Sequence, residues 1–400
     1  MTPIDIETGV TDDESRMRDV CHQFAADVLR PAGRALDRLD NPADVIAPGS
    51  ILWDVFRQYR ALGIVELAND MSMDPVVKAR LMCLINEELA WGDVGLAISL
   101  GLSMFHGPWV QQTGDAGLID RFCSAERPTV GCWALTEPDH GSDTVTLTEP
   151  HFGDPALKPN CTAQRDGDEF VINGQKAAWV SNGSLADIAV LFCTLDRSQG
   201  FKGGAVFLVP LDLPGVERPK PLDKLGQRSL NQGEVFFNDV RIPASYMAVG
   251  PEFYSMALEA MLAYANASMG QLFVGVARAA FEHAVDYAKE RVQGGVPIFE
   301  HQSVKGRLFK MFTKVEAARS LVRRVSLYNA TNPPMVQYSI ASKVLATTTA
   351  FEVASEALQI FGGNGLSREY PIEKLLRDAR ASMIEDGCNE VLSLMGAARL

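Results

Sequence analysis

The densest group of residues that could do chemistry lies between Trp133 and Asp143. This segment reads WALTEPDHGSD and leaves an apolar run for a loop rich in acidic residues and glycine. Such a loop exposes backbone N–H groups, and the hydroxyls of Thr136 and Ser142 add two more donors. The pattern predicts a site for an acceptor-rich ligand. The alternative is a surface turn closed by Asx and Ser caps.

Two further segments carry residues of the kinds that bind ligand rings and phosphates. Trp179 follows a β-type run, so its indole either stacks on a ligand ring or fills the core. The segment QIFGGNG at 359–365 resembles a dinucleotide fingerprint, but it ends a helix instead of following a strand. Its glycines predict a helix C-cap, and the alternative is a backbone that a pyrophosphate approaches closely.

The elements that must position these segments follow from the hydrophobic pattern. Near the N-terminus, apolar residues such as Met17, Val20 and Phe24 recur at helical spacing. Short β-rich runs separated by turn residues come next, and long helical patterns then return. The sequence predicts an α+β multidomain protein with an N-terminal helical domain, a central β-barrel-like domain and a C-terminal four-helix bundle. The predicted boundaries are 1–128, 129–244 and 245–400.

Composition excludes several classes of protein. The 400 residues include 37 Lys+Arg and 50 Asp+Glu, a net charge of −13, which argues against nucleic acid or an anionic membrane as partner. The seven cysteines form no C-x-x-C pair, which fits free thiols in a reducing compartment and predicts no metal site. The N-terminus does not resemble a signal peptide, and no apolar run has the length of a membrane span. We therefore expect a cytoplasmic protein.

Five motifs, in order and spacing, make the chain similar to the acyl-CoA dehydrogenase family over nearly its whole length. They are T-E-P-x-x-G-S-D at 136–143, K-L-G-x-R-S at 224–229 before F-x-D-V-x-I-P at 237–243, Arg291 with His301 and Gln302, Q-I-F-G-G-N-G at 359–365, and E-K-L-L-R-D-A at 373–379. The resemblance implies an FAD-dependent oxidoreductase of fatty acid metabolism.

The resemblance also implies where the cofactor binds. In the family, FAD lies between the β domain and the C-terminal bundle, and a neighbouring subunit completes the site. The residues that match the ring-facing positions are Trp133, Leu135, Thr136, Ser142, Trp179 and Ser181. Those that match the phosphate and adenosine end are Arg291 and Gln302, and those that match a contact from the partner subunit are Gln359, Gly362 and Gly363. A homo-oligomer, either a dimer or a tetramer, is therefore expected.

The implied reaction is the α,β-desaturation of an acyl-CoA or acyl-carrier thioester. A base removes the α-proton while the β-hydride moves to flavin N5, and an electron-transfer flavoprotein is the expected oxidant. The family's usual base is the Glu of a Tyr-Glu-Gly-Thr segment. Here Asp386 stands at the Glu position and Glu385 at the Tyr position, while Ala265 fills the family's other base position. Asp386 is thus the predicted catalytic residue, and Ser142, Glu385 and Gly387 are expected beside the substrate.

Several positions depart from the family pattern. Replacing Glu by Asp retracts the carboxylate by about 1.5 Å at most, and a misplacement of about 1 Å costs ~10²-fold in rate when nothing compensates. Cys388 and Glu390 stand where the family often has Thr and Gln, and Gly294 replaces an aromatic residue. His140 lies where a small residue is usual. The loop at 150–160 is longer than usual, and either covers the thioester entrance or is a surface insertion.

Two other functions stay open at this point. One is a flavin-dependent monooxygenase or another non-dehydrogenase flavoenzyme, in which Asp386 is not an α-base. The other is a non-catalytic relative that binds nucleic acid, against which the net charge argues. If the dehydrogenase reading holds, small residues on a pocket-side helix predict room for a branched or cyclic acyl group. These residues are Gly95, Ala97, Ser99 and Gly101.

Overall fold

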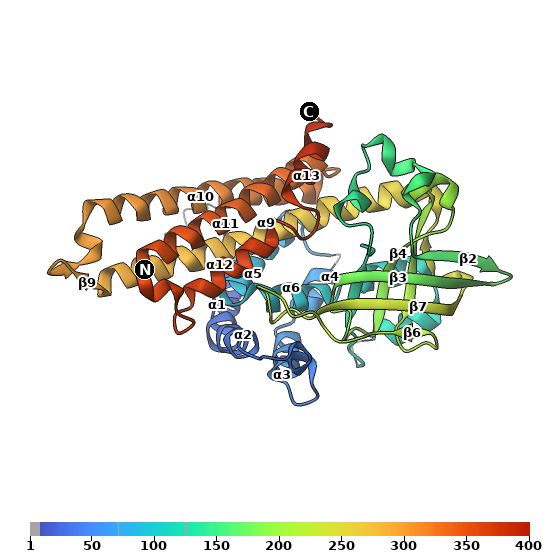
Figure 1. The fold of residues 1–400 in the computed structure, drawn as a ribbon, viewed down its shortest axis with the longest axis horizontal. Coiled ribbons are helices and arrows are strands. Elements are labelled where there is room, and N and C mark those ends of the chain that lie inside the picture. Colours follow the sequence, from blue (N-terminus) through green and yellow to red (C-terminus); the bar gives the residue numbers. More distant parts are fainter. Residues whose placement is uncertain (1–8, 71, 125) are drawn as a thin grey trace.

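The chain folds into three parts that follow one another along the sequence (Figure 1). The computed structural model describes residues 9–70, 72–124 and 126–400. A sheet forms one end of the molecule, long helices extend away from it, and the N-terminal helices pack near the junction of the two. The predicted order of helical, β and helical regions is therefore confirmed.

The described residues of the N-terminal part form eight α-helices, several of which begin at polar caps. Thr11 and Glu14 form a reciprocal capping box, and Ser50, Asp74 and Asp93 each accept backbone N–H groups in the first turn of their helices. These caps satisfy donors that a helix start leaves unpaired. The helices are α1 Asp12–Phe24, α2 Arg30–Asp37, α3 Ile51–Ala61, α4 Ile64–Asn69, α5 Pro75–Gly92, α6 Val94–Leu102, α7 His106–Thr113 and α8 Ala116–Phe122.

The predicted barrel-like domain is a mixed sheet. Its strands run in the order β6-β7-β3-β2-β4-β5-β8, and β1 pairs in parallel with β4. The whole of β4 is buried, because protein covers both of its faces, and it accordingly reads as a continuous apolar run. The strands are β1 Gly131–Ala134, β2 Thr162–Asp166, β3 Glu169–Ser181, β4 Ile188–Thr194, β5 Gly204–Pro210, β6 Val216–Glu217, β7 Gln232–Pro243 and β8 Met247–Val249.

The C-terminal part is built on three long helices that pack along one another. They are α9 Pro251–Glu290, α10 Gln302–Thr331 and α11 Val336–Phe361, followed by α12 Ile372–Ser382 and α13 Asn389–Ala397. A hairpin of β9 Val292–Gln293 and β10 Val296–Pro297 joins α9 to α10 at the tip far from the sheet. By length and composition α9 is able to cross a membrane, but 78% of its apolar stretch is buried inside the protein, as in a core helix.

Short helical turns complete the chain. A π-helical turn spans Ala25–Leu29, and 3₁₀ turns span Pro42–Ile46, Ser142–Val145, Pro150–Gly153, Pro155–Leu157, Arg197–Gly203, Ala244–Tyr246, Ile298–Glu300 and Gly362–Leu366. Strand β8 lies beyond the predicted boundary at 244 and pairs with β5. Helix α9 follows it directly and packs Tyr254 against Phe192 of β4, so the sheet and the bundle share one core.

Candidate active site

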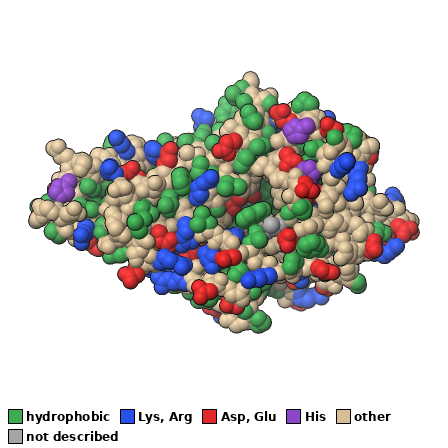
Figure 2. Space-filling model, in the orientation of Figure 1, with side chains coloured by type: hydrophobic (Ala, Val, Ile, Leu, Met, Phe, Trp, Pro, Cys, Tyr) green, Lys and Arg blue, Asp and Glu red, His purple; other side chains and the backbone are tan. Residues whose placement is uncertain are grey.

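A cavity of ≈ 1690 Å³ opens between the sheet and the helices, and Figure 2 shows this face of the molecule hollowed there. Its walls come from the loop after β1, the end of β3, helices α6 and α9, and the turn between α12 and α13. Pockets for drug-sized ligands measure about 300–1,000 Å³, so this cavity has room for a ring system and a second ligand. It gathers these predicted residues: Trp133, Leu135, Thr136, Ser142, Trp179, Ser181, Glu385, Asp386 and Gly387.

A buried ion pair fixes the loop after β1. The Glu137 carboxylate lies 2.7 Å from the Lys176 ammonium of β3, which also donates to the Leu135 carbonyl at 2.9 Å. The backbone N–H groups of Asn160 and Cys161 donate to the same carboxylate. Burial alone would raise the pKa of Glu137, but the Lys176 charge and these donors hold it below its usual value. The loop is therefore held rigidly at its first turn.

Two further contacts set the second half of this loop. His140 Nδ1 lies 2.7 Å from the Asp143 carboxylate, and its Nε2 lies 2.8 Å from the Leu157 carbonyl. With both ring nitrogens engaged, His140 closes the loop and leaves no nitrogen for a ligand. Ser142 Oγ accepts a hydrogen bond from the backbone N–H of Cys388 at 3.0 Å, which joins the loop to the turn before α13.

Two tryptophans face the cavity in different ways. The side chain of Trp179, at the end of β3, is 60% exposed although protein surrounds the cavity, so its ring is free to stack on a ligand. Trp133 packs among other aromatic rings, and its Nε1 is buried without a hydrogen-bond partner among the described residues. Ser181 Oγ accepts from the Gln232 amide at 2.9 Å. Two roles were predicted for Trp179, a core aromatic or a ring that stacks on a ligand. Its ring lines the cavity and does not fill the core.

The predicted base lies on a tight turn between α12 and α13. Asp386 has φ 54° and Gly387 has φ 85°, the left-handed region that few residues other than Gly, Asn and Asp enter. Lys343 of α11 holds this turn by donating to the Gly387 carbonyl at 2.9 Å and to the Asn389 side chain at 2.8 Å. Within the part of the chain that the structure describes, no group donates a hydrogen bond to the Asp386 carboxylate.

The two acids of this turn have raised pKa values. Burial raises the pKa of Asp386 to about 6, against the opposing charge of Lys343. Burial and the neighbouring Asp386 charge raise the pKa of Glu385 to about 7. Burial also lowers the pKa of Lys343 to about 8. With a pKa of about 6, the Asp386 carboxyl is mostly ionised at neutral pH and can accept a proton there.

Residues 224–229 match a family motif in the sequence, and the structure adds that 224–227 form part of the cavity wall. Lys224 donates to two backbone carbonyls and to Gln232 Oε1 at 2.8 Å, and burial lowers its pKa to about 7. Gln227 Nε2 donates to Glu385 Oε1 at 2.5 Å. Both side chains line the cavity. The sequence signal for this role was the family motif alone.

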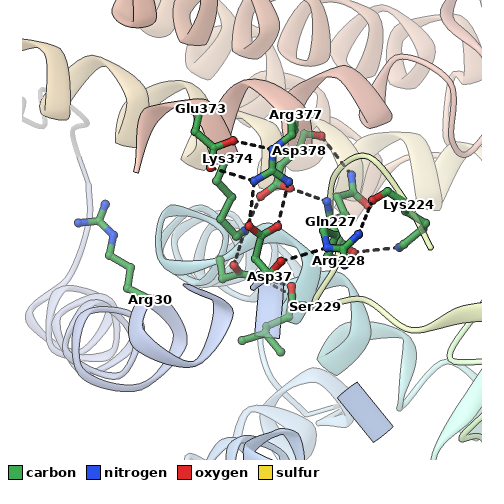
Figure 3. A network of polar contacts seen from close by, with 12 residues as sticks. Arg30, Asp37, Lys224, Gln227, Arg228, Ser229, Glu373, Lys374, Arg377 and Asp378 are labelled. Atoms are coloured by element: carbon green, nitrogen blue, oxygen red, sulfur yellow. Dashed lines mark hydrogen bonds and ion pairs between the residues drawn. The ribbon is translucent and has the colours of Figure 1, made fainter. Parts of the chain in front are cut away.

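A network of charges fixes this segment against helix α12 (Figure 3). Lys374 lies 2.6 Å from both Asp93 and Asp378, and Asp378 accepts the backbone N–H of Gln227 at 2.5 Å. A Cβ on Gly226 would meet the Arg377 carbonyl at 2.3 Å, so only glycine allows the segment to approach α12 this closely. The N-terminal helices, the sheet and the bundle therefore meet beneath the cavity.

The residues predicted for the phosphate end of the cofactor lie elsewhere. Arg291 and Gln302 flank the β9–β10 hairpin, Gln359 lies in the last turn of α11, and the Gly362-Gly363 pair follows that helix; all are exposed and none lines the cavity. Gly362 has φ 59°, in keeping with the predicted glycine at a helix C-terminus. One chain therefore brings together the ring-facing half of the predicted site and not the other half.

Other predicted features sort into wall and scaffold. Ala97, Gly101 and Ala265 line the cavity, whereas Gly95 does not and Ser99 bonds to Asn182 at 2.7 Å. The loop at 150–160 does not line the cavity; it packs Phe152 against Phe201, as a surface insertion would. The cavity wall also includes aromatic and sulfur side chains of α9 that sequence reasoning missed. These are Phe253, Met256 and Tyr264.

The donors and rings of the cavity fit an oxidised flavin ring. The exposed indole of Trp179 offers a flat surface, and the hydroxyls of Thr136, Ser142 and Ser181 lie around the same cavity. Acceptor-rich heterocycles are bound by such convergent donors on an apolar wall.

Comparisons with known proteins point to one family. Residues 132–240 match the model of the acyl-CoA dehydrogenase middle domain, and residues 254–400 match that of the C-terminal domain. The mouse mitochondrial short-chain specific acyl-CoA dehydrogenase is 30% identical over 394 residues, covering 96% of this chain and 89% of that protein. Butyryl-CoA dehydrogenase from Megasphaera elsdenii superimposes with a TM-score of 0.83 at 28% identity, covering 98% and 99% of the two chains. A glutaryl-CoA dehydrogenase of Mycobacterium smegmatis in complex with FADH2 shares the fold, with a TM-score of 0.81 at 21% identity and coverage of 97% and 94%.

Proposed function

The chain belongs to the acyl-CoA dehydrogenase family, and we propose that Asp386 is the base with which it desaturates an acyl thioester. Membership makes it an oxidoreductase that acts on CH–CH donors and uses a flavin. It favours dehydrogenation over the monooxygenase alternative. The observation that carries our proposal is the Asp386 carboxylate, which lines the cavity, accepts no hydrogen bond from any residue that the structure describes, and has a pKa raised to about 6.

The reaction requires one proton transfer to a residue of this chain. The bound flavin supplies the acceptor for the hydride that leaves the β-carbon. Asp386 takes the proton from the α-carbon, so the C–H bond breaks and the carboxylate becomes a carboxylic acid. Lys343 holds this turn in place, so the Asp386 carboxylate is restricted to a small range of positions. This restriction offsets part of the loss of reach relative to a Glu side chain.

The remaining cavity residues bind and orient. Ser142 accepts from the Cys388 N–H, so its own O–H is free to donate to an acceptor of the cofactor or the thioester. Trp179 presents its ring for stacking. The Glu137–Lys176 pair keeps the loop after β1 in place without contributing a free charge to the cavity. These groups are organised before ligands arrive, which reduces the cost of binding.

We further propose FAD as the flavin and a short or branched acyl group as the substrate. The ring half of FAD would lie against Trp133, Leu135, Thr136 and Ser181, and its phosphate end against Arg291, Gln302, Gln359 and the glycine pair of a second copy. The separation of these two groups within one chain supports a homo-oligomer. The short-chain relatives and the small wall residues Ala97 and Gly101 support the acyl size. An electron-transfer flavoprotein as oxidant, the thioester carrier and a cytoplasmic location stay predictions.

Anaerobic reduction of the bound flavin tests this proposal. Acyl-CoA thioesters, beginning with butyryl-CoA, are mixed with the purified holoenzyme while flavin absorbance is followed. We expect bleaching by at least one thioester and formation of its α,β-unsaturated product. The flavin of Asp386→Asn should not be bleached. The matched control for this variant is Asp212→Asn, at an exposed acid that pairs with Arg121, and its flavin should be reduced as in the wild type. Bound flavin that no thioester bleaches would oppose the proposal.

A further inference from the structure

The turn at residues 385–387, the acid turn, presents two carboxyl groups to the cavity on consecutive residues. Glu385 and Asp386 both line it, but they are held differently. Asp386 has no donor among the described residues, whereas Glu385 Oε1 accepts from Gln227 Nε2 at 2.5 Å. A role for Glu385 in the chemistry rests on the proposed role of Asp386. It goes beyond that role, because it concerns what sets the strength of the base.

Gln227 is built to hold Glu385 in one place. Its φ of 49° lies in the left-handed region, which is uncommon for a side chain of this size. Its backbone N–H donates to Asp378 at 2.5 Å, and its amide also donates to the Asp378 carbonyl at 3.3 Å. Figure 3 shows Gln227 beside Asp378 of α12, to which it is hydrogen-bonded. Strained conformations of this kind persist where surrounding contacts over-determine them, and they cluster at functional sites.

Lys343 acts by charge on both carboxyl groups of the acid turn and Lys224 on that of Glu385, and further titratable groups lie around these two lysines. Lys224 and Arg228 lie on the 224–229 segment, Lys374 and Asp378 on α12, Lys343 on α11, and Cys388 and Glu390 at the start of α13. Lys343 is held by its bonds to Gly387 and Asn389, and Asp378 by its contacts with Gln227 and Lys374. Glu385, by contrast, is held by a hydrogen bond from one neutral side chain, that of Gln227.

We propose that Glu385, held by Gln227, is a positioning residue whose ionised carboxylate strengthens Asp386 as a base. The physical reason is repulsion between like charges. When both carboxylates are ionised, a proton on Asp386 relieves the repulsion, so proton transfer from the substrate becomes more favourable. The proton goes to Asp386 and the negative charge moves onto the substrate, away from Glu385. Glu385 itself exchanges no proton with the substrate.

This arrangement predicts two ionisations in the rate of flavin reduction. The rate should rise once as Asp386 ionises and again as Glu385 ionises, whose pKa lies at about 7. In Glu385→Gln the second rise should vanish, and the rate at pH 8 should fall about 3- to 10-fold. In Gln227→Leu the loss of the donor disfavours the ionised form of Glu385. The second rise should therefore move to higher pH by about 1 unit.

The experiment is stopped-flow reduction of the holoenzyme by butyryl-CoA from pH 5 to pH 9. Glu217→Gln, an exposed acid on β6, is the matched control and should keep both rises. Bound flavin and the midpoint of thermal unfolding are measured for each variant, and Gln227→Leu carries the test if Glu385→Gln does not fold. A merely structural role would lower the rate at every pH and leave both rises where they are.

Two outcomes separate this inference from the proposed function. If Asp386→Asn reduces as fast as the wild type, the proposed base is wrong and the inference fails with it. If Asp386→Asn is inactive while Glu385→Gln keeps the second rise and its rate at pH 8, Asp386 stands and only the role of Glu385 is overturned. An unmoved second rise in Gln227→Leu overturns the role of Gln227 in the same way.

Discussion

The two ends of the helical bundle contrast in how they hold the residues predicted to bind the cofactor. At the sheet end, the ring-facing residues line one cavity and are fixed by buried ion pairs, such as Glu137 with Lys176. At the tip, Arg291 and Gln302 are exposed beside a two-stranded hairpin. The difference teaches that one chain holds only the ring-facing half of the predicted site in a fixed arrangement. The proposal that a second copy brings its tip to the cavity accounts for the other half.

The largest effect on stability should come from breaking the cavity end. Lys176→Met leaves Glu137 buried without its cation, which typically costs about 3–5 kcal/mol. We expect the free energy of unfolding to fall by this amount and the bound flavin to be lost. Denaturant unfolding of the purified protein measures the first, and flavin absorbance measures the second. A loss below 1 kcal/mol would show that the loop is not anchored as described.

The tip should respond in the opposite way. Arg291→Ala removes an exposed guanidinium, so the free energy of unfolding should hardly change. FAD affinity should nevertheless fall by about 10-fold or more, as for a lost charge-assisted hydrogen bond to phosphate. Titration of apoprotein with FAD measures the affinity. An unchanged dissociation constant would remove the tip from the site and, with it, the reason for a second copy.

The base itself should give the reaction an acid limit. Since the pKa of Asp386 is raised to about 6, the carboxylate is lost as the pH falls below that value. The rate of flavin reduction should then fall about tenfold per pH unit. Stopped-flow reduction between pH 4.5 and 6.5 checks the slope. A rate that is flat down to pH 4.5 would mean that the base has an ordinary carboxyl pKa or is another group.

The smallest effect on stability should come from breaking an exposed ion pair at the tip with the same Lys→Met change as in Lys176→Met. Lys305 lies 3.0 Å from Glu300, and both side chains are about half exposed. Lys305→Met should change the free energy of unfolding by less than about 1 kcal/mol, because solvent screens such pairs. Denaturant unfolding beside Lys176→Met sharpens the contrast between the two ends. Equal losses in the two variants would contradict it.

The sequence predicted much of the cavity because its residues lie in short local motifs. The loop at 133–143 and the turn at 385–387 each carry their donors or acids within a few positions, so residue type and order suffice. The partners that fix them do not follow this rule. Lys176 lies far along the chain from Glu137, and Gln227 farther still from Glu385. Such contacts depend on how the sheet and helices pack, which local patterns do not encode.

The split of the predicted cofactor site has the same origin. Motif order placed Arg291 and Gln302 with the cofactor but gave no distance from Trp133 or Thr136. The length of α9, which runs from the sheet to the tip, separates them within one chain. His140 shows the converse case. A histidine in a ligand-binding loop suggests an altered site, yet both its nitrogens are used by Asp143 and Leu157.

Anaerobic flavin reduction in Asp386→Asn tests the central claim most directly. The amide keeps the size of the side chain and cannot accept the α-proton. The account predicts normal folding and bound flavin, with reduction by the active thioester slowed by about 10²–10⁴-fold relative to the wild type and to Asp212→Asn. Reduction of Asp386→Asn at the wild-type rate would contradict the account and assign the proton transfer to another group in the cavity.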